Sequence, residues 1–81
     1  MALVSLKYVL EEAKRGGYAV GAFNFFNLEN LKGIIEAATL KKSPVIAMAS
    51  VGAMKIMGEK LVVAASKAIA QEYDTEVVLH L

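Results

Sequence analysis

Three short apolar runs, separated by stretches with helical periodicity, constrain the fold of this chain more than any other feature. The runs occupy positions 18–24, 45–49 and 76–81. None of them alternates polar and apolar residues, which is typical of strands covered on both faces. A full helical segment separates each run from the next, so tight hairpins are excluded and the strands are expected to pair in parallel.

The intervening segments carry signals for the start and end of helices. The first helix is expected to follow an N-cap at Ser5 and to stop at Gly16-Gly17, and a second helix follows the N-cap Asn27. A short helical stretch breaks near Gly58, and a longer helix then runs over about 59–73. The residues expected on the inner faces of the three longer helices are Leu6, Val9, Leu10 and Ala13, then Leu28, Leu31, Ile35 and Ala38, then Val62, Ala65, Ile69 and Tyr73.

The resulting order is α-β-α-β-α-β, an α/β unit with a leading helix followed by βαβαβ. Crossover connections of this kind are almost always right-handed. Two architectures accommodate the unit: a doubly wound open sheet, or part of a (β/α)₈ barrel. The small residues Ala19, Gly21 and Ala22 in the first run suit a crowded barrel interior. A complete barrel takes roughly 250 residues, so this chain would supply about a third of one.

Composition indicates that the chain buries surface against additional structure. Its hydrophobic fraction is 57%, above the roughly 45–50% of soluble domains, although a small domain needs less apolar content than average. The longest uncharged runs, 17–28 and 43–54, are shorter than the roughly 18–20 residues that span a bilayer. The N-terminus lacks the features of a signal peptide. We therefore expect a cytoplasmic protein with no membrane partner.

The charge balance argues against a nucleic-acid partner. Nine Lys and Arg residues oppose eight Asp and Glu residues, for a net charge of +1. The basic pairs Lys14-Arg15 and Lys41-Lys42 lie where helices are expected to end, and cations there complement the helix dipole. The chain contains no basic stripe with interleaved aromatic residues. It contains no cysteine either, which excludes disulfides and thiolate metal sites.

Polar residues stand at the carboxyl ends of the three apolar runs, where parallel α/β folds place their functional sites. They are Asn24, Ser50 and His80. The Asn24 amide can donate and accept hydrogen bonds, which suits a hydroxyl or enediolate oxygen, although asparagine is also common in turns. Ser50 at a helix start can hold a phosphate or simply cap the helix.

Two further features have no assigned role from the residues alone. His80 is the only histidine, and no second His or carboxylate has a supporting ligand spacing, so no metal ligand is assigned and a structural role is expected. The pair Phe25-Phe26 lies in a strand-to-helix loop, as a lid over a pocket or as a contact with other structure.

A resemblance to a known family extends over essentially the whole chain. The sequence is similar, in register, to the N-terminal segment of class II, metal-dependent fructose-bisphosphate and tagatose-bisphosphate aldolases. The run from Gly17 to Asn24 is the most specific match. The segments that carry the resemblance are 1–7, 12–14, 17–24, 27–29, 35–38, 43–46 and 78–81.

The resemblance implies a barrel fold and an aldol reaction. Residues 1–81 would be the incomplete N-terminal portion of a (β/α)₈ barrel domain. The family cleaves fructose or tagatose 1,6-bisphosphate reversibly to dihydroxyacetone phosphate and glyceraldehyde 3-phosphate, a step of carbohydrate metabolism that includes glycolysis. A divalent metal, usually zinc, polarises the ketone. By resemblance, Asn24 would hold the dihydroxyacetone or enediolate part of the substrate, and Ser50 would bind a sugar phosphate.

The resemblance also implies that the zinc ligands lie outside this chain. His80-Leu81 resembles the start of the family's His-Leu-Asp-His motif, whose aspartate and metal-binding histidine would follow Leu81. Three functions stay open: an aldolase segment that is inactive alone, a non-catalytic fragment that self-associates as a homo-oligomer, or a segment complemented by a separate C-terminal fragment.

Overall fold

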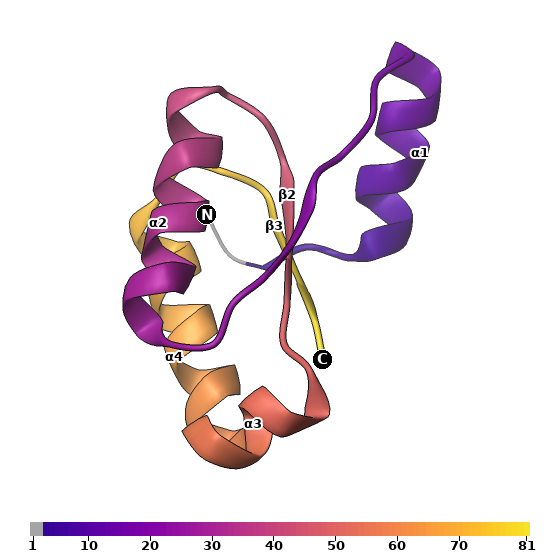
Figure 1. Ribbon diagram of the computed structural model, residues 1–81. Coiled ribbons are helices and arrows are strands. Elements are labelled where there is room, and N and C mark those ends of the chain that lie inside the picture. Colours follow the sequence, from indigo (N-terminus) through magenta and orange to yellow (C-terminus); the bar gives the residue numbers. More distant parts are fainter. Residues whose placement is uncertain (1–2) are drawn as a thin grey trace.

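The computed structural model describes residues 3–81 and contains a three-stranded sheet with helices on both sides (Figure 1). The first two residues of the family-like opening segment, Met1 and Ala2, lie outside this range. None of the helices in residues 3–81 is both long and apolar enough to cross a bilayer. The elements are α1 (Leu6–Gly16), β1 (Ala22–Asn24), α2 (Leu28–Leu40), β2 (Val45–Met48), α3 (Val51–Met57), α4 (Glu59–Glu72) and β3 (Val77–His80).

The sheet confirms the α/β class and the parallel pairing expected from the sequence. Its strand order is β1-β2-β3 with every pair parallel. Helical segments connect each strand to the next, as parallel pairing requires. Beside β3, Leu3 forms an isolated parallel bridge with Val77, and the Val4 N–H donates to the Val77 carbonyl at 2.9 Å. The N-terminal segment therefore occupies the start of the β3 edge.

The predicted helix starts and stops agree with the structure. The side-chain oxygens of Ser5, Asn27 and Ser50 each accept a hydrogen bond from the backbone N–H three residues later, at 3.2, 2.7 and 3.1 Å. Gly17 ends α1 with a φ of 71°, and Gly58 separates α3 from α4 with a φ of 97°. Glycine adopts these left-handed conformations without the steric cost that a side chain brings.

The two faces of the sheet carry separate apolar clusters. Helices α2 and α4 lie together on one face, and α1 lies on the other (Figure 1). On the α1 side, Val9 packs with Ile46 and Val78. The larger cluster, on the side of α2 and α4, consists of Phe25, Leu31, Ile35, Val45, Ala47, Ala49, Val62, Ala70 and Val77. Successive residues of a strand point to opposite faces, so β2 and β3 each contribute to both clusters.

The prediction of a buried first strand over 18–24 is wrong in length and in burial. The strand covers only Ala22–Asn24, and all three of its residues are exposed. Its backbone is paired on one side, where the Gly21 carbonyl accepts from the Ile46 N–H at 3.0 Å. Within residues 3–81 no strand pairs with its other side. The apolar sequence of β1 therefore lies at a sheet edge instead of inside the sheet.

The predicted inner faces of all three longer helices also need correction. In α2, Leu31 and Ile35 are buried, but Leu28 is 40% exposed. In α1, Val9 and Ala13 are buried, but Leu6 and Leu10 are exposed because the small sheet covers only part of that face. In α4 the buried residues are Val62, Ser66 and Ala70, spaced four apart, in place of a stripe through Ala65. Four other residues that were predicted on inner faces are only half-buried, namely Ala38, Ala65, Ile69 and Tyr73.

The pair Phe25-Phe26 divides between core and surface. Phe25 is 2% exposed and belongs to the cluster under α2 and α4, whereas Phe26 is 65% exposed. The Phe25 N–H donates to the Met48 carbonyl at 2.8 Å, which holds the chain against β2 just after β1 ends. Phe25 is thus a core residue, and the lid interpretation does not apply to it.

Polar contacts join α2 to the end of α4. The hydroxyls of Thr39 and Thr75 lie 2.6 Å apart. The Tyr73 hydroxyl donates to a Glu36 carboxylate oxygen at 2.7 Å. This hydrogen bond is the main cause that raises the pKa of Tyr73 above its ordinary value of 10.0. These contacts hold together the two helices that cover one face of the sheet.

Replacing Ser66 by alanine is expected to stabilise the fold. Ser66 is 2% exposed, and its hydroxyl has no hydrogen-bond partner among the described residues. Removing a buried unpaired hydroxyl from a helix should raise the free energy of unfolding by about 1–2 kcal/mol, measured by urea denaturation. The exposed change Ala68→Ser, in the same helix, measures the helix-propensity difference alone and should cost about 0.5 kcal/mol. Equal and opposite effects at the two positions would show that burial contributes nothing.

Candidate functional site

The carboxyl ends of the three strands meet at one end of the sheet and place three side chains in a row. The register pairs Asn24 with Met48 and Met48 with His80. Residues paired in this way point to the same face of a sheet. The row lies on the face that carries Ile46 and Val78, because these residues precede Met48 and His80 by two positions. Asn24 and His80 therefore flank Met48 on the α1 side of the sheet.

Asn24 is the last residue of β1 and is exposed. Its side-chain amide has no hydrogen-bond partner within residues 3–81. The backbone on either side is fixed, since Phe23 and Asn24 pair with β2 and the following residue, Phe25, donates to the Met48 carbonyl. The structure thus presents an available amide on a positioned backbone, which is what a ligand-binding asparagine requires.

Ser50 follows β2 and precedes α3, and its side chain is exposed. Its hydroxyl oxygen accepts from the Ala53 N–H at 3.1 Å, which confirms the interpretation as an ordinary N-cap. The cap uses the oxygen as an acceptor and leaves the hydroxyl proton available for a donor role. Both Ser50 and Asn24 lie at the carboxyl ends of strands, as the sequence predicts.

His80 is the last residue of β3, and its exposed side chain shares the row with Asn24. Its carbonyl accepts from the Ala49 N–H at 3.0 Å. Residues 3–81 contain no cluster of three His, Cys, Asp or Glu side chains able to hold a metal ion. One imidazole supplies one ligand, so the described residues do not by themselves fit a zinc ion.

The position of Met48 could not be found from residue type alone. Methionine is a flexible side chain that fills gaps in apolar clusters, and Met48 packs partly against the α1-side cluster. The strand register shows that Met48 lies between Asn24 and His80, so an apolar side chain separates the two polar ones. The sequence shows only that Met48 is near the end of an apolar run. This position predicts its neighbours only when the pairing of the strands is already known.

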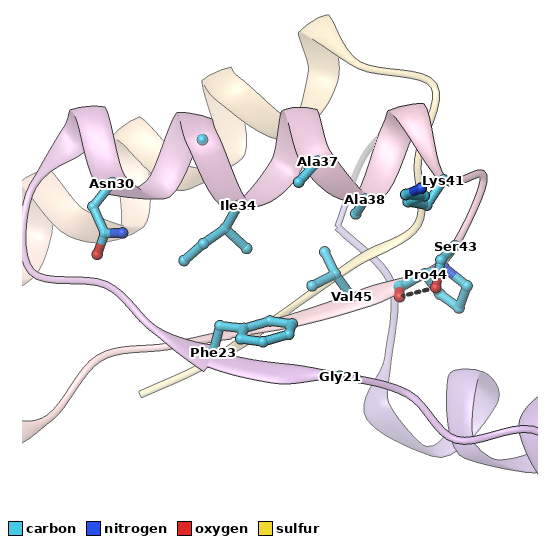
Figure 2. Close-up of a pocket in the computed structure, with 11 residues that line it drawn as sticks. Gly21, Phe23, Asn30, Ile34, Ala37, Ala38, Lys41, Ser43, Pro44 and Val45 are labelled. Atoms are coloured by element: carbon cyan, nitrogen blue, oxygen red, sulfur yellow. Dashed lines mark hydrogen bonds between the residues drawn. The ribbon is translucent and has the colours of Figure 1, made fainter.

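A groove on the surface lies away from this row. It is a groove of about 520 Å³ between β1 and α2, on the face opposite to Asn24. Figure 2 shows the Phe23 ring beneath Ile34, with Asn30 near one end of α2 and Lys41 near the other. Its remaining lining is dominated by small and apolar residues. The groove follows the strand edge that has no partner within residues 3–81.

Comparison with known proteins identifies similar sequences and folds. A family model described as "Fructose-bisphosphate aldolase class-II" matches residues 4–81. A "Probable fructose-bisphosphate aldolase" of Bacillus subtilis (strain 168) is 49% identical over 84 aligned residues, which cover all of this chain and 30% of the relative. The crystal structure of the YdjI aldolase from Escherichia coli K12 superposes with a TM-score of 0.86 at 31% identity, over 96% of this chain and 30% of that one.

The chain matches only part of each relative's length. The chain spans 30% of the length of the Bacillus subtilis protein and 30% of the Escherichia coli structure. The similar portion includes all of the strand ends described above, since the family match runs over residues 4–81. The similarity therefore extends to the whole α/β unit and to a fraction of each relative.

Proposed function

Because this chain belongs to the class II fructose-bisphosphate aldolase family, we propose that it forms the first part of a (β/α)₈ barrel that cleaves a ketose bisphosphate. The observation that carries the proposal is the row of strand ends, in which an available Asn24 amide shares a face with His80. Barrel enzymes of this type place their reacting groups at the carboxyl ends of the strands.

The roles proposed for this chain are binding and orientation of the substrate. Asn24 holds a hydroxyl or the developing enediolate oxygen of the dihydroxyacetone part, where a fixed donor stabilises negative charge. Ser50 donates a hydrogen bond from its hydroxyl group to a phosphate oxygen of the sugar while its oxygen caps α3. The family's zinc supplies a positive charge that polarises the ketone. Residues 3–81 present no cluster to hold that ion, so no chemical step is assigned to it.

The groove beside β1 supports a unit that is completed by further structure. The Gly21 carbonyl and the Phe25 N–H bond to β2, so the alternation of strand hydrogen bonds directs the Ala22 and Asn24 backbone groups away from the sheet. An additional parallel strand would satisfy them, and a helix would fill the groove against Ile34. On this basis the 81 residues alone are inactive, and a C-terminal fragment or continuation completes the site.

A second candidate function is self-association with a structural role. The observation in its favour is the same open β1 edge, because an unpaired strand is a template for pairing with another chain. On this alternative the groove beside β1 would be covered by another copy, with no catalysis.

A chimera distinguishes the two candidates. The 81 residues replace the matching 30% of the Bacillus subtilis relative, and cleavage of fructose 1,6-bisphosphate and of tagatose 1,6-bisphosphate is measured with and without added zinc. We expect metal-dependent cleavage by the chimera and none by the 81 residues alone. The proposal is contradicted by a folded chimera that cleaves neither substrate. The second candidate would then be favoured if the 81 residues form an oligomer that dissociates to monomers when pairing at the β1 edge is blocked.

Replacing Ser50 by aspartate in the chimera should raise KM for the sugar bisphosphate by about tenfold or more. The new carboxylate would lie against a phosphate group of the substrate, and the two negative charges repel each other. Aspartate is as good an N-cap as serine, so α3 keeps its start. Ser5→Asp makes the same change at the N-cap of α1, which is not at the carboxyl end of a strand, and should leave KM unchanged. An unchanged KM in the Ser50 variant would leave this serine with its capping role alone.

A further inference from the structure

Three residues connect the end of β1 to the helix that follows it. Asn24 ends β1 and α2 begins at Leu28, so the chain leaves the sheet through residues 25–27 (Figure 1). The Asn24 amide lies on the last residue before this turn. A loose turn would let the end of β1 move, and a displacement of about 1 Å at a group that contacts the substrate lowers a rate substantially. The contacts that hold residues 25–27 therefore affect how Asn24 is presented.

The two phenylalanines of the turn are held in different ways. Phe25 is 2% exposed, and its N–H donates to the Met48 carbonyl at 2.8 Å. The Phe26 ring is 65% exposed, so packing does little to fix this residue. The Phe26 backbone N–H donates to the side-chain oxygen of Asn30 at 3.3 Å. Asn30 therefore supplies the contact that ties the exposed part of the turn to α2.

Asn30 is itself held by the N-cap of the same helix. Its backbone N–H donates to the Asn27 side-chain oxygen at 2.7 Å. In a capping box, the side chain of the third helical residue returns to the N–H of the N-cap. The Asn30 side chain reaches one residue further back, into the turn. Because asparagine is a poorer helix former than leucine, this hydrogen bond serves the turn more than it serves α2.

The contact uses one of the two polar atoms of the Asn30 amide. The oxygen accepts from Phe26, whereas the nitrogen has no hydrogen-bond partner within residues 3–81. Figure 2 shows the side chain below the first turn of α2, at one end of the groove beside β1. A carboxylate at this position would accept the same hydrogen bond, and negative charge in the first turn of a helix is favourable. A direct contact with a sugar phosphate would instead need the nitrogen as a donor, and a carboxylate would repel that ligand.

We propose that Asn30 is a positioning residue for Asn24. Its amide oxygen holds the Phe26 N–H, which keeps the turn between β1 and α2 in one conformation and the Asn24 amide in one place relative to the substrate. Asn30 itself does not touch the substrate. This inference rests on the proposed function, because it concerns the residue to which that function assigns the enediolate oxygen.

Kinetics of chimera variants test this role. Asn30→Leu should lower kcat for ketose-bisphosphate cleavage about five- to tenfold, the effect of losing one neutral hydrogen bond, with KM within about twofold of the parent. Asn30→Asp keeps the acceptor and should keep kcat within about twofold. Gln71→Leu makes the same kind of change at an exposed position of α4 and should leave kcat unchanged. A loss in Asn30→Asp as large as that in Asn30→Leu would overturn the proposal, since it would assign the role to the amide nitrogen.

A double variant shows whether the effect passes through Asn24. In the Asn24→Ala background, Asn30→Leu should lower kcat no further, because the amide that it positions is gone. Effects of the two changes that multiply would show that Asn30 acts independently of Asn24, and the proposal would be wrong.

A measurement without catalysis separates this inference from the aldolase assignment. In hydrogen exchange of the 81-residue chain followed by NMR, the Phe26 amide should exchange about fivefold faster or more in Asn30→Leu and at the parent rate in Asn30→Asp. Circular dichroism verifies that each variant is folded. An unchanged Phe26 exchange rate in Asn30→Leu would overturn the proposal even if the chimera is active. A folded but inactive chimera contradicts the proposed function and leaves Asn30 no reaction to serve, whatever the exchange rate.

Discussion

Replacing Asn24 by alanine in the chimera is expected to lower kcat for ketose-bisphosphate cleavage about 100- to 1,000-fold, the usual effect of losing one donor that faces developing negative charge. The amide stands on a backbone held by β2 and has no partner within residues 3–81, so its hydrogen bonds are available to substrate. Steady-state kinetics with fructose 1,6-bisphosphate and tagatose 1,6-bisphosphate measure the change.

The control for this variant removes an amide elsewhere. Gln71 is exposed on α4, which covers the face of the sheet opposite to Asn24, and Gln71→Ala should leave kcat unchanged. The effect expected of Asn24→Ala should be in kcat more than in KM, because the contact strengthens as charge develops. A kcat within threefold of the parent chimera would return Asn24 to the role of a residue that only terminates a strand.

Much of the architecture could be predicted because its causes are local or follow directly from the order of elements. Ser5, Asn27 and Ser50 cap helices through hydrogen bonds to groups three residues away, so residue type and position are sufficient. The parallel sheet follows from helices standing between the apolar runs, since no short connection is available for antiparallel pairing. The positions of Asn24 and Ser50 at strand ends follow in turn.

The errors concern features that depend on distant parts of the molecule. The side chains of a strand are buried only where other elements cover its faces, and within residues 3–81 an open groove lies beside the edge strand β1. Leu6 and Leu10 are exposed for a similar reason, because the sheet beneath α1 is narrow. In α4 the choice between Ala65 and Ser66 depends on a helix rotation of about 100°, which a pattern of small residues does not determine.

The candidate site was predictable to the level of strand ends and no further. The substrate roles proposed for Asn24 and Ser50 rest on the resemblance to class II aldolases, because residue chemistry alone leaves those roles open. The row of Asn24, Met48 and His80 required the strand register, because a shift of one residue would send each side chain to the opposite face. The metal centre of the family is not predictable from this chain, whose described residues contain a single histidine and no ligand cluster.

Replacing Phe25 by alanine is expected to destabilise the fold by about 3–5 kcal/mol. Phe25 is 2% exposed and packs with the cluster beneath α2 and α4. Truncation removes a buried aromatic ring and leaves a cavity that the surrounding strands and helices can only partly fill. Domains of this size have a free energy of unfolding of roughly 0.05–0.15 kcal/mol per residue, or about 4–12 kcal/mol in total. The variant should therefore lose a large share of its stability in urea denaturation.

The adjacent residue is the matched control for this effect. Phe26 is 65% exposed, and Phe26→Ala should change the free energy of unfolding by no more than about 0.5 kcal/mol. The two changes remove the same atoms from neighbouring positions, so they alter the composition and the unfolded chain almost equally. The difference between their free energies of unfolding therefore measures the effect of burial. Equal effects at the two positions would contradict the division of this pair between core and surface. A large effect at Phe26 alone would indicate that its ring, and not that of Phe25, is covered in the folded protein.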